Sequence, residues 1–305
     1  MPSYGFVIVD VFTDRPMTGN PLAVFPDARG LDADQMQAIA REFNLSETTF
    51  VVPPRAPNAT FRLRCFSPSA EVYGAGHNAL GAWWVLAARG VVDLIPPMTI
   101  VQQELGERVL PVTVFSQSGR PTSVSMTQAA PSFGDSYTNR ALLARALGRA
   151  THDLEVDGLE PQAVSTGAMH LLVPVRTLAS LTHVKLDVER LIEIAHPLGA
   201  HGCYLYALET RDYGSAAHAR AFFPGIGIAE DPATGSAAGP LAAMLVHRGR
   251  MAQDEWRVIE QGDEMRRPSR IRVRVSGDRI EVAGSCAIVG EGTLTIDEAP
   301  RRIKE

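Results

Sequence analysis

The sequence predicts an α+β protein of two similar halves, each wrapping strands around its own buried helix. The 305 residues exceed what one compact core usually holds, so two domains are expected. Many short strand-like runs occur with few helices, unlike the regular strand–helix alternation of a doubly wound parallel sheet. In addition, two apolar segments far apart in the chain resemble each other.

The two related segments are residues 74–90 and 233–249, which align without gaps. Each has a glycine near its start, Gly76 or Gly235, and each ends in Arg-Gly. Both are apolar nearly all round, as expected of a helix buried on every side. Chance similarity between two Ala- and Gly-rich helices would explain the match, and so would an internal duplication. A duplication would give each half its own central helix.

The first elements can be read in order. Residues 4–12 are rich in Val, Ile and Phe and predict a strand. Asp32, with Gln35 three positions later, predicts a capped helix that Asn44 can end. Residues 48–52 are again prone to form a strand. Ser46 and Glu47 therefore lie where a helix ends and a strand begins.

Further strands are expected along the rest of the chain. They fall at 61–66, 98–101, 110–115, 123–126, 170–175, 203–208, a hairpin over 271–282, 287–289 and 292–296. Two regions, 130–157 and 187–198, look helical and amphipathic.

The composition bounds the function. Twenty-nine Lys and Arg against 34 Asp and Glu give a net charge of −5, which argues against a nucleic-acid or anionic-membrane binder. No apolar run reaches the roughly 18 residues of a membrane span, and the N-terminus lacks the features of a secretory signal. Cys65, Cys203 and Cys286 are widely spaced, which indicates reduced thiols and no zinc site. We expect a cytoplasmic protein without a metal.

The starts of the two related segments could hold an anion. A helix that begins with Gly76-His77 or Gly235-Ser236 presents unpaired backbone N–H groups and the positive end of its dipole. Such ends bind carboxylates or phosphates, and glycine allows a ligand close to the backbone. If the two halves face each other, both ends converge on one cleft. That cleft would bind an anionic metabolite without a net positive charge.

Acid and base groups accompany these helix starts. Glu47 is followed by apolar residues, and a carboxylate with apolar neighbours suits proton transfer, although a solvated loop residue is its simpler explanation. His77 at a helix start would favour the neutral ring and could serve for capping or catalysis. Asp231 could simply cap the second helix, and Ser236 is likewise a common residue at the start of a helix. Each signal is weak by itself.

Together these residues carry a resemblance. Residues 44–51, Gly76-His77 and residues 230–240 resemble the signature blocks of the PhzF-like phenazine-biosynthesis isomerases. Further matches lie at 18–25, at 66–71 and at 165–170. The blocks run in family order from about residue 6 to residue 245. The long block around Asp231 is the most specific of them.

The resemblance implies a fold similar to diaminopimelate epimerase. Two pseudo-symmetric halves would each form a β-barrel around a central apolar helix, with the active site in the cleft between them. We expect residues 1–117 plus 287–305 to form one half and residues 118–286 to form the other. The resemblance also implies a homodimer that uses no cofactor.

The implied reaction is a proton shift on a small carboxylate-bearing metabolite, similar to the isomerisation of trans-2,3-dihydro-3-hydroxyanthranilate. Glu47 matches the family's proton-shuttling glutamate. The other matched positions are the supporting residues His77 and Asp231 and the substrate-binding Gly76, Gly235 and Ser236. Departures from the family pattern occur at Asn78-Ala79 and at Met169, which affects the expected contacts with substrate.

Three alternatives remain open. A racemase or epimerase of the same fold would use paired cysteines beside the helix starts, where this chain has Ala75 and Thr234. A nicotinamide dehydrogenase would explain the G-x-G-x-x-A pattern over 74–79 with Asp93 about twenty residues on, but a poor strand precedes it. A metabolite-binding homologue without turnover is the third.

Overall fold

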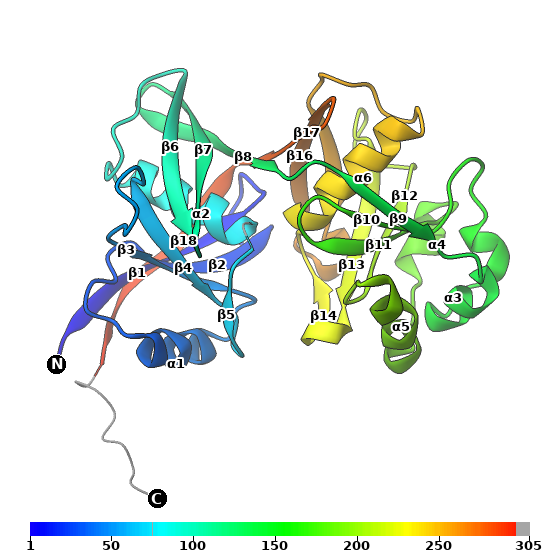
Figure 1. Ribbon diagram of the computed structural model, residues 1–305, viewed down its shortest axis with the longest axis horizontal. Coiled ribbons are helices and arrows are strands. Elements are labelled where there is room, and N and C mark those ends of the chain that lie inside the picture. Colours follow the sequence, from blue (N-terminus) through cyan, green and yellow to red (C-terminus); the bar gives the residue numbers. More distant parts are fainter. Residues whose placement is uncertain (75, 297–305) are drawn as a thin grey trace, which may run out of the picture. The chain divides into compact units, whose positions relative to one another are not determined.

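The computed structural model describes residues 1–74 and 76–296 (Figure 1). It divides into two compact units. The first comprises Met1–Met17, Pro21–Val124 and the segment from Ser285 onward, and the second comprises Thr18–Asn20 and Ser125–Gly284. The boundaries expected from the sequence lie after residue 117 and before residue 287. Ala75, and residues 297–305 of the predicted first half, lie outside the described residues.

The first unit is mostly strands. Its elements are β1 (Ser3–Val11), β2 (Asn20–Phe25), α1 (Ala33–Phe43), β3 (Thr48–Val52), β4 (Phe61–Phe66), β5 (Glu71–Val72), α2 (His77–Ala88), β6 (Met98–Leu105), β7 (Arg108–Gln117) and β18 (Cys286–Thr295). Strand β8 (Arg120–Gln128) contains the boundary at Val124/Ser125 and so belongs to both units.

The second unit has more helices. Its elements are β9 (Ser132–Ser136), α3 (Arg140–Ala146), β10 (Gln162–Ser165), β11 (Met169–Pro174), α4 (Leu178–Thr182), α5 (Val188–Ala195), β12 (Cys203–Ala207), β13 (Ala217–Phe223), β14 (Ile228–Asp231), α6 (Gly235–His247), β15 (Arg257–Gln261), β16 (Ser269–Ser276) and β17 (Arg279–Gly284). Four short 3₁₀ turns lie at Thr151–Leu154, His196–Leu198, Pro224–Ile226 and Asp263–Met265.

Each unit packs its strands around one buried helix. In the first unit α2 contacts β1, β3, β7 and β18, and in the second α6 contacts β10, β11, β16 and β17. Most side chains of both helices are buried, as expected from apolar residues on all sides. Gly81 of α2 shows how close the packing is, because an added Cβ would lie 2.6 Å from Leu22. Both helices end before a left-handed glycine, Gly90 or Gly249.

The two units repeat one pattern of strand pairing. In the first, β3 pairs antiparallel with β4, which pairs antiparallel with β5 and parallel with β6. In the second, β12, β13, β14 and β15 pair in the same sense. Each buried helix lies between the third and fourth strand of its series. The pairing therefore shows the same local architecture on both sides of the chain.

A matching ion pair accompanies this pattern. The guanidinium of Arg64 on β4 donates two hydrogen bonds, of 2.8 and 2.7 Å, to the carboxylate of Glu71 on β5. Arg220 on β13 donates two, of 2.8 and 2.9 Å, to Glu230 on β14. Each arginine also lies over a phenylalanine ring of its own strand. These bidentate pairs hold the short strand that leads into each buried helix.

Helix α1 forms as the capping pattern predicts. Asp32 accepts from the N–H of Gln35, whose side chain accepts from the N–H of Asp32, and Asn44 ends the helix in the left-handed conformation. Its buried face, which includes Met36 and Ile39, packs on an aromatic core with Phe25 and Phe50. That packing anchors the segment between α1 and β3.

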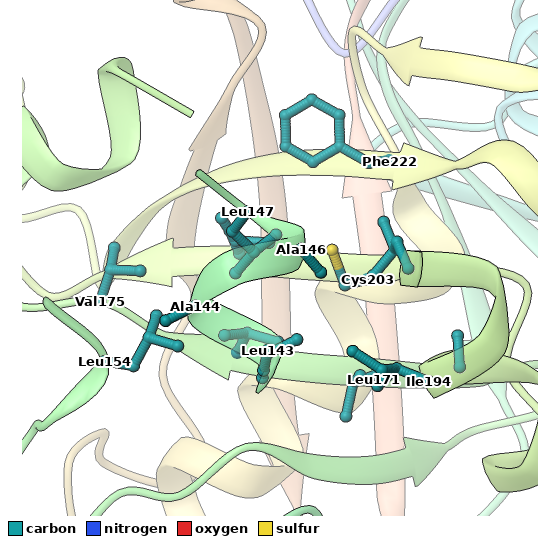
Figure 2. Packing of buried hydrophobic residues seen from close by; sticks show 14 of the residues in the cluster. Leu143, Ala144, Ala146, Leu147, Leu154, Leu171, Val175, Ile194, Cys203 and Phe222 are labelled. Carbon is teal, nitrogen blue, oxygen red and sulfur yellow. The ribbon is translucent and has the colours of Figure 1, made fainter. Parts of the chain in front are cut away.

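The second unit has a separate aliphatic core. Figure 2 shows side chains of α3, β11 and β12 meeting, among them Leu143, Leu171 and Cys203. Full burial of one such leucine contributes roughly 1.5–3 kcal/mol, so this core stabilises the second unit with its own side chains. None of the helices that the structure describes combines the length and apolar character needed to cross a bilayer.

Several local expectations were wrong. Residues 130–157 were expected to be helical, but β9 occupies 132–136 and α3 covers only 140–146. The two candidate strands at 287–289 and 292–296 form one strand, β18, which pairs with β1 and bends where the register shifts at Ile8/Val9. Strand β13 was missed, because it alternates alanine, which is depleted in strands, with His218 and Arg220, and it has no β-branched residue.

A buried charged cluster surrounds His218 of β13. Nδ1 lies 2.8 Å from Oε2 of Glu260, and Nε2 lies 3.1 Å from Oε2 of Glu264. Burial by itself lowers the pKa of His218, but the hydrogen bonds to the two carboxylates outweigh burial and raise the pKa to about 9. His218 is therefore an imidazolium at neutral pH. It links β13 to β15 and to the 3₁₀ turn after β15.

We predict that His218→Gln lowers the free energy of unfolding by about 3–5 kcal/mol at pH 7, because buried Glu260 loses its cation and Glu264 keeps only Arg211. In the wild type, the raised pKa stabilises the fold fully below the ordinary value near 6.5, and this stabilisation is lost as the pH rises through about 9. Urea unfolding at pH 6.5 and pH 9.5 measures both effects. His196→Gln, at an exposed histidine, is the matched control. Equal unfolding midpoints for the two variants would contradict this assignment.

Candidate active site

The predicted residues fall into two groups, one in each unit. Glu47, Gly76 and His77 belong to the first unit. Asp231, Gly235 and Ser236 belong to the second. In both groups the residues lie at or just before the start of the buried helix, or in contact with it.

In the first unit, Glu47 contacts the first residue of α2. Oε2 of Glu47 lies 3.4 Å from Nδ1 of His77, and the two side chains are 18% and 11% exposed. The hydroxyl of Ser46 lies 3.5 Å from Nε2 of the same ring. The loop between α1 and β3 therefore presents a carboxylate and a hydroxyl to the two ring nitrogens of His77. The sequence predicts that Glu47 follows a helix and that His77 begins one, but it does not predict this contact.

The start of α2 is held by Asn78. Its Oδ1 accepts from the N–H groups of Gly76 and Ala79, each at 2.7 Å, and its Nδ2 donates to the carbonyl of Gly74 at 2.9 Å. The N-cap, Gly76, offers no side chain to cap the helix. Asn78, a departure from the family pattern, therefore orders the turn that carries His77.

His77 is neutral near physiological pH. Burial lowers its pKa to about 4, because a charged ring would lose its hydration. The contact with Glu47 is thus between a carboxylate and a neutral imidazole. A neutral ring donates from one nitrogen and accepts at the other, so it can pass a hydrogen bond between Glu47 and a second polar group.

In the second unit, Asp231 is a buried carboxylate that makes no ion pair with any residue the structure describes. It is 7% exposed, its Oδ1 accepts from Nδ2 of Asn20 at 2.9 Å, and its Oδ2 accepts from the Thr234 hydroxyl. Burial raises the pKa of Asp231 to about 6, against the opposing effect of these hydrogen bonds. The carboxyl can therefore gain or lose a proton close to neutral pH.

A hydrogen-bond network orders the turn after Asp231. Gln261 of β15 donates to the Asp231 carbonyl at 2.7 Å and accepts from the Thr234 N–H at 3.1 Å. The hydroxyl of Tyr204 donates to the same Gln261 oxygen at 2.9 Å. Asn20 also donates to the Ala233 carbonyl at 2.8 Å. These contacts fix the turn from which α6 begins.

Gln128 and His170 contact the backbone of the first turn of α6. Gln128 donates to the Gly235 carbonyl at 2.9 Å and accepts from Thr166 at 2.6 Å. Pro240 has no N–H, so it cannot bond to the carbonyl of Ser236 four residues earlier. His170 of β11 is buried, and a hydrogen bond with the Ser236 backbone opposes the burial that lowers its pKa to about 4.

Sequence reasoning did not single out the supporting residues. Asn20 and His170 lie inside the quoted family blocks, but nothing in their spacing indicated a role. Gln261 and Tyr204 lie in or beside strands that pair with β13, far from Asp231 along the chain. Only the strand pairing brings them to the start of α6.

Other features bear on the chemistry. Among residues 1–74 and 76–296, no three His, Cys, Asp or Glu side chains are grouped to hold a metal ion. The three cysteines are buried, and burial raises the pKa of each thiol. The short strand before α2 pairs antiparallel with β4, which is not the parallel strand that precedes a dinucleotide-binding turn.

Known proteins are similar in sequence along nearly the whole chain. An uncharacterized isomerase of Mesorhizobium japonicum is 34% identical over 307 residues, covering 97% of this chain and all of that protein. The trans-2,3-dihydro-3-hydroxyanthranilate isomerase of Pseudomonas aeruginosa is 34% identical over 294 residues, covering 94% of this chain and 98% of its own.

Solved structures of known proteins have a similar fold. A PhzF-family phenazine biosynthesis protein of Bacillus anthracis superposes with a TM-score of 0.87 at 28% identity, covering 97% of this chain and all of that one. A hydroxyproline epimerase of Agrobacterium vitis, at 15% identity, has a TM-score of 0.63 over 97% of this chain and 93% of its own, which shows the shared mixed α/β fold alone. The model of the phenazine biosynthesis-like proteins, PhzC-PhzF, matches residues 9–292. This chain therefore belongs to the phenazine biosynthesis-like PhzC-PhzF family.

Proposed function

We propose that this protein is a cofactor-independent isomerase that uses Glu47 to move a proton on a small carboxylate-bearing metabolite. The observation that carries the proposal is the contact between Glu47 and the neutral ring of His77 at the start of a buried helix. The proposed reaction is similar to that of trans-2,3-dihydro-3-hydroxyanthranilate isomerase, the name of a relative 34% identical to this chain.

In the proposed reaction, ionised Glu47 takes a proton from one carbon of a conjugated system. The electrons of that C–H bond shift into the conjugated system, and the protonated Glu47 then returns the proton to a different carbon. No electron is gained or lost overall, so the step needs no redox partner. One carboxyl can serve both positions when the substrate is held within hydrogen-bond reach of it.

Neutral His77 supports this role of Glu47. With Nδ1 facing Glu47 and Nε2 facing Ser46, the ring can hold the carboxylate in one orientation. Because burial keeps the ring uncharged, it does not neutralise Glu47 with a full positive charge. A base paired with a cation would be weaker, so the neutral ring favours proton abstraction.

The second unit supplies groups for substrate binding. We assign the substrate carboxylate to the N–H groups at Gly235 and Ser236, because a helix start attracts anions. Asp231, with a pKa of about 6, would exchange a proton with a hydroxyl or amino group of the substrate. The expected homodimer stays a prediction of the resemblance.

A racemase or epimerase that uses two thiols is disfavoured. Each of Cys65, Cys203 and Cys286 is buried, and burial raises the pKa of its thiol, so none is a thiolate at neutral pH. A protein that binds the metabolite without turnover would retain the helix starts but would not need Glu47 beside His77. Deuterium exchange from the solvent into a bound ligand distinguishes that alternative.

We predict that Glu47→Gln abolishes turnover while leaving the fold and substrate affinity intact. Loss of a general base slows a reaction by about 10²–10⁴-fold. The assay is conversion of trans-2,3-dihydro-3-hydroxyanthranilate in D₂O, with product deuterium measured by mass spectrometry and affinity by calorimetry. Glu42→Gln, an exposed glutamate of α1, is the control and should behave as wild type. Wild-type rate and deuterium incorporation in Glu47→Gln would remove Glu47 from the role.

We predict that His77 remains neutral down to about pH 5, because its pKa is lowered to about 4. Long-range ¹H–¹⁵N correlation spectra of ¹⁵N-histidine protein, recorded from pH 8 to pH 4.5, would show both ring nitrogens in the neutral pattern. His77→Asn assigns the signal. A midpoint near the ordinary histidine value of about 6.5 would show that the ring is charged beside Glu47.

We predict that the three thiols resist alkylation in the folded protein and that activity survives treatment, since buried protonated thiols are poor nucleophiles. Iodoacetamide at pH 8, with intact-mass measurement and an activity assay, tests this, and urea-unfolded protein gives full labelling as the reference. Two modified cysteines with parallel loss of activity would favour the thiol-pair alternative.

A further inference from the structure

An open cavity of about 300 Å³ lies on the first unit and is lined by four arginines. We call it the arginine pocket, with Arg29, Arg55, Arg62 and Arg64 as its charged lining. Val52, the last residue of β3, also lines the pocket, whereas Glu47 precedes the first residue of that strand. Five strand residues span roughly 16 Å, so the pocket is distinct from the Glu47–His77 pair.

The positive charge in the pocket is incompletely neutralised. Nε of Arg62 is buried without a hydrogen-bond partner, and the Glu104 carboxylate lies 3.5 Å from it. The other oxygen of Glu104 accepts hydrogen bonds from the backbone N–H groups of Arg55 and Ala56, at 2.6 and 2.9 Å. No ion pair joins the exposed guanidinium of Arg55 to a carboxylate within the described chain.

The remaining two arginines already have partners. Arg64 donates two hydrogen bonds to Glu71, and Arg29 is paired with Asp27. Burial lowers the pKa of Arg62, and the neighbouring charge of Arg55 lowers it further. The effect of Arg55 is the repulsion expected between two positive charges that lie close together. An anion entering the pocket would relieve it.

The repeated architecture provides an internal comparison. In the first unit, Arg62 of β4 is the register partner of Glu104 on the parallel strand β6. In the second unit, His218 of β13 is likewise the register partner of Glu260 on the parallel strand β15. Glu260 accepts from two loop N–H groups, those of Arg211 and Asp212, just as Glu104 does. The two clusters therefore share one backbone arrangement.

The clusters differ in the number of acids. His218 has a second carboxylate, Glu264, which also binds Arg211 at 3.0 Å. Arg270 beside them pairs with Asp212 and Asp263. In the part of the first unit that the structure describes, Glu104 is the one carboxylate paired with Arg62. Among the described residues, the Arg62 cluster thus has one acid where the His218 cluster has two.

We propose that the arginine pocket binds a compact multivalent anion, through phosphate or carboxylate oxygens that bridge Arg55 and Arg62. Guanidinium groups bind both kinds of oxygen in a planar, two-pronged geometry. The volume suits a ligand the size of pyrophosphate or citrate. Binding here is independent of the proton transfer assigned to Glu47.

The test is isothermal titration of the full-length protein at low ionic strength, with pyrophosphate and citrate in separate experiments. The variant is Arg55→Gln, which removes an exposed charge that takes part in no side-chain ion pair among the described residues. Arg120→Gln is the control, because it removes the same charge at another exposed position of the first unit. Wild type and Arg120→Gln should bind one anion saturably, and Arg55→Gln should bind it at least about 10-fold more weakly.

The outcomes separate cleanly. Binding of pyrophosphate alone identifies a phosphate ligand, and binding of citrate alone identifies a polycarboxylate. Glu47→Gln should bind the anion as wild type does, which separates this site from catalysis. Failure of both anions to bind saturably would overturn the proposal, as would equal affinities of Arg55→Gln and Arg120→Gln.

Discussion

The structure depends on two helices that are apolar on every side. A helix of this kind can be stable in water only if strands cover it completely, so α2 and α6 each require a surrounding shell of strands. Their backbone ends remain polar even though their side chains are buried. The chain therefore places its polar residues where these helices begin, and the candidate active-site residues lie there.

The polar backbone at the start of each buried helix is surrounded by different residues in the two units. At α2, the Asn78 side chain binds the backbone of Gly74, Gly76 and Ala79, and the buried ring of His77 stays neutral. At α6, the polar groups before the helix bind one another, and Asp231 is the buried acid among them. Repeated architecture thus carries two different titrating groups, a histidine with a lowered pKa and an aspartate with a raised one. Such opposed shifts are typical of sites that handle protons.

The same divergence occurs away from the helix starts. Arg62 and His218 occupy equivalent register positions, each against a glutamate that also binds loop N–H groups. In the second unit a further glutamate completes a neutralised cluster and holds β15 to β13. In the first unit the arginines border an open cavity instead. A shared backbone has therefore been used for stability on one side and has left a charged cavity on the other.

Local sequence determined much of this protein. The capping pair Asp32 and Gln35, the helix end at Asn44 and the all-round apolar α2 and α6 follow from short-range chemistry, and each was predicted. Tertiary structure decided the rest. Strand β13 was not recognised, because its alanines have weak strand propensity, and its His218 and Arg220 look like surface residues although both faces of the strand are buried. The shifted pKa of Asp231 and the support from Asn20 and Gln261 depend on burial and on strand pairing between distant segments, which short-range patterns do not encode.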